Sequence, residues 1–286
     1  MKDYQKIMRK LISHPSSGIK MVRKLTARHR KCCVHCGTIG HLHIHSTDNN
    51  GIQTYQCQAC RRTFTELYGT IFYKSKIPIS SWLLAIIYWV TATGGLSAAD
   101  LGRKIGVSHL TAWRMLMKIR EKLNNGLGQE MLQGLVEADE AWFGRKNNQD
   151  IVMGMVERDK RKIRLITIPN VKEETLYPHI RENIVEGSKF FTDSRITYSI
   201  TGIRYHHQTT NHSKGEFARE GGVHSNTIEQ IWGDIKGVIR TIHHGISKKY
   251  RELYLAQYSF AYQFKHSTNL FFKTLCQLFT PTYCLI

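Results

Sequence analysis

The chain has 286 residues, enough for one to three domains with a buried core. Its 41 Lys and Arg residues outnumber its 22 Asp and Glu residues, giving a formal net charge of +19 and a pI of about 9.7, so a polyanionic partner, first of all nucleic acid, is expected. The longest uninterrupted apolar run, residues 82–90, is far shorter than the ~20 residues of a membrane span, which argues against a membrane protein.

Residues 1–30 are rich in Lys and Arg, and their apolar residues recur at the spacing of a short amphipathic helix. These apolar residues are Ile7, Met8, Leu11 and Ile12. We predict a basic N-terminal arm that is either solvated or in contact with a DNA backbone. No apolar signal core follows the first residues, so secretion is not indicated and a cytoplasmic location is expected.

Two Cys-x-x-Cys pairs separated by 20 residues lie within residues 31–70. Their cysteines are Cys33, Cys36, Cys57 and Cys60. Four thiolates at this spacing suit one tetrahedral Zn²⁺ in a closed, structural shell better than a disulfide framework. We predict a zinc ribbon that holds Arg61 and Arg62 against DNA, with a purely structural role as the alternative. Cys32 is a neighbour that could compete for the ion.

Residues 77–127 are predicted to be helical and to bind DNA, beginning with an apolar and therefore buried helix. Residues 96–114 then have the pattern of a helix-turn-helix, in which Gly106 permits the turn and Ser108 caps the second helix. Its predicted core consists of Ala99, Leu101, Ile105, Val107, Ala112 and Met115. The side chains expected to face a DNA major groove are His109, Thr111 and Arg114. Helix packing without DNA contact is the alternative.

After a Gly- and Asn-rich linker at residues 124–128, residues 131–275 have a different character. Their predicted strands are residues 132–143, 151–156, 162–168, 189–192 and 203–208. Helices are predicted over residues 172–184 and from Asn226 onward, and residues 276–286 form a tail. The order strand, strand, strand, helix, strand, helix, strand, helix is that of a ribonuclease-H-like α/β fold, a mixed sheet flanked by helices. In such a fold, acids from the first and fourth strands and from a later helix converge at one edge.

Three acids stand at those places. Asp139 lies where the first strand is expected to end, Asp193 follows the fourth strand, and Glu229 is in the last predicted helix, with 35 residues between it and Asp193. Lys236 follows Glu229 by seven residues, about two helical turns, so both side chains project from one face. We predict that the three acids hold divalent metal. Alternatively, Asn226 and Glu229 form a capping box at the start of the helix.

With these residues in view, the chain resembles the DDE transposases of bacterial insertion sequences that carry an N-terminal zinc ribbon, a family akin to the eukaryotic Merlin elements. The resemblance covers nearly the whole chain after residue 30. Beyond the Cys pairs and the helix-turn-helix, its motifs lie at residues 136–140 (Val-Glu-Ala-Asp-Glu), 190–193 (Phe-Phe-Thr-Asp), 211–217 (Asn-His-Ser-Lys-Gly-Glu-Phe), 224–229 (His-Ser-Asn-Thr-Ile-Glu), 243–247 (His-His-Gly-Ile-Ser) and 254–260 (Tyr-Leu-Ala-Gln-Tyr-Ser-Phe). Residues 261–263, Ala-Tyr-Gln, depart from the family's usual Arg-Tyr-Asn.

The resemblance implies a transposase that binds the terminal inverted repeats of its insertion sequence and catalyses DNA cleavage and strand transfer into target DNA. Asp139 and Asp193 would be the first two metal ligands. The third would be Glu229 or Asn226, with Glu229 preferred because a carboxylate neutralises Mg²⁺ better than an amide does. Two Mg²⁺ or Mn²⁺ ions and a phosphate contact from Lys236 would support phosphoryl transfer. Pairing two ends implies at least a homodimer, in the bacterial cytoplasm and associated with the nucleoid.

Two other functions fit the same residues. A DNA-binding regulator with a non-catalytic ribonuclease-H-like domain would bind DNA without metal-dependent nicking. A metal-dependent nuclease or resolvase of this fold would cut DNA without joining ends. The presence of all three acids argues against the regulator.

Overall fold

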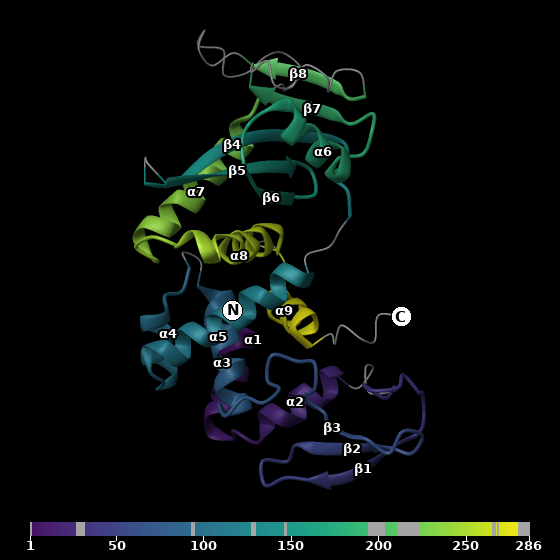
Figure 1. Ribbon diagram of the computed structural model, residues 1–286. Coiled ribbons are helices and arrows are strands. Elements are labelled where there is room, and N and C mark those ends of the chain that lie inside the picture. The colour runs from purple at the N-terminus through teal and green to yellow at the C-terminus, as the bar shows by residue number, and fades with distance from the viewer. Residues whose placement is uncertain are drawn as a thin grey trace. The chain divides into compact units, whose positions relative to one another are not determined.

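Figure 1 shows the computed structural model, which describes residues 2–26, 32–92, 95–126, 130–145, 148–193, 204–210, 224–264, 267 and 269–279. The chain divides into two compact units, one formed by residues 1–123 and 268–286 and the other by residues 124–267. None of the described helices combines the length and the apolar character needed to cross a bilayer.

The helices of the first unit are built around α3 (Ile79–Thr91), whose apolar side chains are almost all buried. The other helices are α1 (Lys2–Ser13), α2 (Ser17–Thr26), α4 (Ala98–Ile105), α5 (His109–Gly126) and α9 (Leu270–Phe279). The predicted amphipathic helical character of the N-terminal segment is confirmed, because residues 2–26 form two helices. Both helices pack against α3, as α9 does, and they bury Leu11, Ile19 and Val22. The second unit ends at residue 267, before the expected boundary at 275, because α9 belongs to the first unit.

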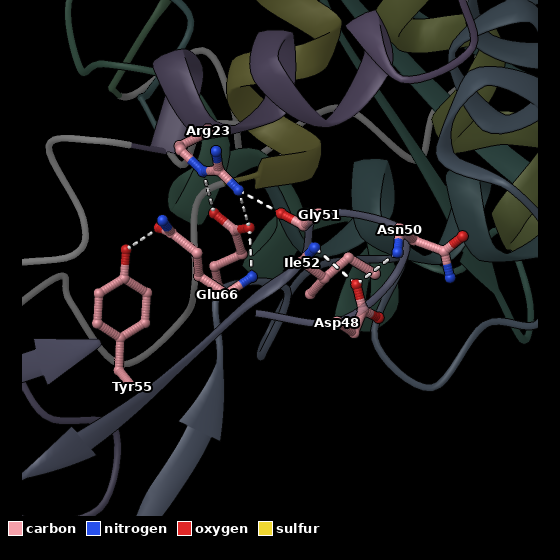
Figure 2. A network of polar contacts seen from close by, with 8 residues as sticks. Arg23, Asp48, Asn50, Gly51, Ile52, Tyr55 and Glu66 are labelled. Atoms are coloured by element: carbon pink, nitrogen blue, oxygen red, sulfur yellow. Dashed lines mark hydrogen bonds and ion pairs between the residues drawn. The ribbon is translucent and has the colours of Figure 1, made fainter. Parts of the chain in front are cut away.

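The predicted ribbon is a three-stranded antiparallel sheet in the order β1 (Leu42–Thr47), β2 (Gln53–Cys57), β3 (Thr63–Thr65). Arg23 of α2 ties it to the helices, as Figure 2 shows. Arg23 Nε donates to Glu66 Oε2 at 3.0 Å and its Nη2 donates to Oε1 at 2.8 Å, while the backbone N–H of Gln53 also donates to Oε1 at 2.8 Å. The Glu66 side chain has no exposed surface, and these charged and polar partners stabilise its carboxylate.

Helices α4 and α5 form the predicted helical pair. Gly106 ends α4 in the left-handed conformation at φ 70°, and the Ser108 hydroxyl accepts from the Thr111 N–H at 3.3 Å at the start of α5. A Cβ at Gly102 would lie 2.8 Å from the Val107 carbonyl oxygen, so this glycine lets the turn fold back onto α4. Leu101, Ala112 and Met115 are buried as predicted, whereas Ala99 is exposed because it lies on the outer face of α4. α5 continues to Gly126, into the expected linker.

The second unit contains a five-stranded mixed sheet. Its strands are β4 (Leu135–Arg145), β5 (Asn148–Glu157), β6 (Lys162–Ile168), β7 (Lys189–Asp193) and β8 (His206–Thr210). Their order is β6-β5-β4-β7-β8. The pairs β6–β5 and β5–β4 are antiparallel, and the pairs β4–β7 and β7–β8 are parallel. This arrangement confirms the predicted ribonuclease-H-like mixed sheet, with strand ends shifted by a few residues.

Helices cover both faces of the sheet. They are α6 (Glu173–Asn183), α7 (Asn226–Thr241) and α8 (Arg251–Phe264), with a short 3-10 turn, η4 (Lys248–Tyr250), before α8. Val136 and Ala138 pack with α6, whereas Ala141 and Phe143 pack with α7 and α8, as the alternation of side chains along β4 requires. The odd-numbered residues of β4, including Asp139, therefore face α7, and Glu140 faces the opposite side.

Several predicted features lie outside the described residues. They are the motif at residues 211–217, the helix expected between the fourth and fifth strands, linker residues 127 and 128, and tail residues 280–286.

Candidate metal centre and catalytic site

The four predicted zinc ligands gather at one point of the ribbon. The sulfurs of Cys33, Cys36, Cys57 and Cys60 all lie within 4.8 Å of one another. Cys33 Sγ is 3.7 Å from Cys60 Sγ, and Cys36 Sγ is 3.7 Å from Cys57 Sγ. A tetrahedron with Zn–S bonds of ~2.3 Å has edges of about 3.8 Å, so the cluster fits Zn²⁺ without rearrangement. Burial raises the pKa of the Cys33 thiol to about 12, whereas the Thr38 hydroxyl contact lowers that of Cys36 to about 6.

The predicted DNA contacts of the first unit are all on its surface. Arg61 and Arg62 are exposed on the knuckle that follows Cys60, and Arg61 has a positive φ of 62°. His109 and Arg114 are exposed on α5 and Thr111 is partly exposed there, while neighbouring Ala112 is fully buried. The alternation of buried and exposed positions leaves one face of α5 open to a partner.

In the second unit, Asp139 and Asp193 stand level with each other on adjacent strands. β4 and β7 run parallel, and their ladder pairs Leu135 with Lys189 and Glu137 with Phe191, a constant offset of 54. The same offset brings Asp193 to the level of Asp139, on strands about 4.8 Å apart. Next to Asp193, Thr192 Oγ1 donates to the Asp193 carbonyl and lies 2.8 Å from His207 Nε2. Burial lowers the pKa of the His207 imidazole.

α7 runs alongside β4 in the same direction. The Ile228 N–H donates to Glu137 at 3.0 Å, Trp232 Nε1 donates to Asp139 Oδ2 at 3.1 Å, and the Lys236 ammonium lies 5.7 Å from the Phe143 ring centre. Trp232 is 5% exposed, so it packs inward. The indole fits because its neighbour on β5, Gly154, has no side chain: a Cβ there would lie 2.5 Å from the ring.

The start of α7 differs from the capping box that was the alternative. Asn226 is the first helical residue and not the cap, and Ser225, the N-cap, makes no side-chain capping bond. Glu229 instead accepts from the Ser225 hydroxyl at 2.8 Å. Both Asn226 and Glu229 are exposed. On the helical wheel Glu229 lies about 60° from Trp232, the residue that contacts Asp139, and Asn226 lies about 120° from it in the same direction.

Among the described residues, the four cysteines are the one group of three or more His, Cys, Asp or Glu whose ligand atoms lie close enough together to hold an ion. Asp139, Asp193 and Glu229 thus come from neighbouring elements without forming such a cluster. Asp139 and Asp193 are oxygen donors of the kind that Mg²⁺ and Mn²⁺ prefer, and both are partly exposed.

A family model described as an ISXO2-like transposase domain matches residues 131–264. An uncharacterized transposase-like protein of Haemophilus influenzae is 33% identical over 99 residues, which make up 34% of this chain and 78% of that protein. The chain belongs to the insertion-sequence transposases. An uncharacterized protein in transposable element ISH50 of Halobacterium salinarum is 30% identical over 102 residues, or 34% of this transposase and 33% of that protein, so the match spans about a third of the ISH50 protein.

A chain in the solved structure of the simian T-cell lymphotropic virus intasome in complex with the PP2A regulatory subunit B56 gamma is 16% identical. The match covers 62% of this transposase and 67% of the intasome chain, with a TM-score of 0.32.

Positive charge is concentrated in the first unit of the transposase. Residues 1–123 and 268–286 contain 21 Lys and Arg and 5 Asp and Glu, which gives a formal charge of +16. Residues 124–267 contain 20 Lys and Arg and 17 Asp and Glu, which gives a formal charge of +3. The unit that carries the ribbon and the α4–α5 pair therefore accounts for most of the attraction to a polyanion.

Sequence reasoning missed four residues of the second unit that contact the start of α7 or support it. They are Glu137, Gly154, Arg158 and His224. Gly154 carried a signal, because a glycine inside an apolar strand marks a close approach of another segment. Glu137 carried another, since it shares a strand face with Asp139. Arg158 and His224 carried no such signal in the sequence. Arg158 lies in the β5–β6 turn and His224 in the segment before α7, and only the fold brings these two segments together.

Proposed function

We propose that this transposase binds the terminal inverted repeats of its own insertion sequence and catalyses metal-dependent DNA cleavage and strand transfer into target DNA. The observation that carries the proposal is the common level of Asp139 and Asp193 on adjacent parallel strands, with Trp232 of α7 bonded to Asp139. Two carboxylates from neighbouring strands and a third from the covering helix are the donor set for two oxygen-seeking cations.

The third ligand is Glu229, by the same argument. It projects from the side of α7 that carries Trp232, and a carboxylate neutralises a divalent cation better than the amide of Asn226 does. To hold an ion, the Glu229 carboxylate would have to give up the hydrogen bond that it accepts from the Ser225 hydroxyl.

Two bound Mg²⁺ or Mn²⁺ ions would supply activation of a water or a 3′-hydroxyl and stabilisation of the leaving oxygen. The protein's own groups do the rest. Trp232 holds Asp139 in place by donating to its Oδ2. Lys236 projects from the same stripe of α7 as Glu229. Its ammonium moves away from the Phe143 ring to contact a DNA phosphate.

Recognition of the inverted repeats belongs to the first unit, whose charge of +16 is the stronger attraction for DNA. The zinc-held knuckle presents Arg61 and Arg62 to the phosphate backbone, and α5 presents His109, Thr111 and Arg114 to a major groove. Pairing of two element ends requires a homodimer or a larger assembly. Its place of action is the bacterial cytoplasm, on the nucleoid.

The test is Asp193→Ala, with Glu174→Ala, an exposed acid on α6, as the matched control. We expect Asp193→Ala to bind repeat DNA as wild type does while losing Mg²⁺-dependent cleavage and joining, and Glu174→Ala to keep both. Retained joining in Asp193→Ala refutes the proposal. DNA binding by the wild type without any metal-dependent nicking favours a regulator, and cutting without joining favours a nuclease or resolvase.

A further inference from the structure

Glu137 is a buried carboxylate that the proposed metal site does not use. It precedes Asp139 by two residues on β4, so both side chains face α7, and the Glu137 side chain has no exposed surface. An ionised carboxylate in such surroundings needs charged and hydrogen-bonding partners on every side.

Its two oxygens bind two different elements. Oε1 accepts from Nε of Arg158, just after β5, and Oε2 accepts from the Ile228 N–H at 3.0 Å. Ile228 is in the first turn of α7, where the amides have no acceptor within the helix, and Ser225 supplies no side-chain cap. Glu137 therefore caps α7 from the sheet, and its negative charge also favours the positive end of the helix dipole.

Arg158 extends this contact to two further segments. Its Nη2 donates to the His224 carbonyl at 2.5 Å and lies 2.8 Å from His224 Nδ1, and its guanidinium carbon is 5.1 Å from the Phe191 ring centre on β7. Because a guanidinium only donates, Nδ1 is the acceptor in this contact. Arg158 thus joins β4, β7 and the segment that leads into α7.

We propose that Glu137 and Arg158 are positioning residues that hold the three proposed metal ligands at their working separation; this inference rests on the proposed function. Each ligand lies close to the network along its own element. Asp139 follows Glu137 by two residues, Asp193 follows Phe191 by two, and Glu229 follows Ile228 directly. Since partners that orient metal ligands typically account for ~10–100-fold in metal affinity, removing either positioning residue weakens metal binding about 10-fold or more.

The experiment compares Glu137→Gln and Arg158→Lys with the matched control Glu157→Gln. Glu157 is 1% exposed and lies on the same sheet, but it is bound by the Gln133 N–H at 3.0 Å and by Lys160 at 3.4 Å. The Mn²⁺ dissociation constant of the zinc-loaded full chain is measured by calorimetry, and amide exchange is followed over residues 224–232. We expect about 10-fold weaker Mn²⁺ binding and faster exchange in both test variants, and neither change in Glu157→Gln.

Wild-type Mn²⁺ affinity in folded Glu137→Gln or Arg158→Lys, or an equal loss in Glu157→Gln, overturns the positioning role. If one test variant does not fold, the other decides. Failure of the proposed function is distinguishable, because Asp139→Ala and Asp193→Ala then bind Mn²⁺ as the wild type does. That result removes the basis of both proposals.

Discussion

At Gly154 the sheet and α7 approach each other more closely than any side chain would allow. Gly154 pairs with Asp139 across β4 and β5, and a Cβ there would lie 2.5 Å from the Trp232 ring and 2.8 Å from Ile228 Cδ1. The indole that bonds Asp139 therefore depends on a glycine in the neighbouring strand.

We expect Gly154→Ala to lower the free energy of unfolding by about 1–3 kcal/mol, because the added methyl group pushes Trp232 and α7 off the sheet. Denaturant unfolding measures this change. Gly233→Ala in α7 is the control, since nothing lies within 4 Å of a Cβ there and alanine favours a helix. Equal stability of Gly154→Ala and wild type would show that the helix shifts at no cost.

The identity of the third ligand is also decided at the residue scale. We expect Glu229→Gln to lose more Mn²⁺ affinity than the ~10–100-fold that removal of an outer partner costs, because it removes a charged ligand. Asn226→Ala should keep most of the affinity. Calorimetric titration of Mn²⁺ into both variants checks the assignment, and the opposite order would make Asn226 the ligand.

At the scale of elements, the ribbon and α2 are joined through Arg23 and Glu66. Glu66 is fully buried and Arg23 is 30% exposed, unlike the pair of Asp100 and Arg103 on α4, whose side chains are 47% and 73% exposed. We expect Glu66→Gln to cost about 1–3 kcal/mol of unfolding free energy, because the partly exposed guanidinium of Arg23 loses its charged partner in a buried contact. Asp100→Asn, which breaks an exposed pair, should cost less than ~1 kcal/mol. Equal losses in thermal or denaturant unfolding would contradict this ranking.

The ribbon has a small core of its own, so metal should stabilise it directly. We expect one Zn²⁺ per chain in the wild type, and its removal by a chelator to increase amide exchange over residues 32–66. Cys57→Ser should lose the ion, whereas Cys32→Ser should keep it, because Cys32 is outside the four-sulfur cluster. Metal analysis of both variants checks this, and zinc lost from Cys32→Ser would mean that the ligand set is different.

At the scale of the whole molecule, the two units carry unequal charge, +16 and +3. If the first unit holds the repeats, Arg61→Ala should reduce the slope of log affinity against log salt by about 0.9 for the lost phosphate contact. Arg181→Ala, an exposed arginine on α6 of the second unit, should leave the slope unchanged. The affinity for repeat DNA is measured at several salt concentrations. A larger change in slope for Arg181→Ala than for Arg61→Ala would indicate that the second unit binds the repeats.

Local spacing alone determined much of this transposase. Two Cys-x-x-Cys knuckles define their own geometry, and the four sulfurs lie where one ion requires them. Likewise, the alternation and length of the apolar segments predicted the strands of the second unit in their order along the chain and put Asp193 at the end of one of them. Asp139 was expected at a strand end but lies inside β4, because that strand continues to Arg145.

Only the tertiary structure decided which segments meet. The N-terminal helices pack on α3, which lies more than 50 residues further along the chain. The cap of α7 comes from Glu137, 91 residues before Ile228, and the indole beside Asp139 fits because of Gly154 on another strand. These contacts join distant parts of the chain, and neither helical nor strand periodicity carries information about them.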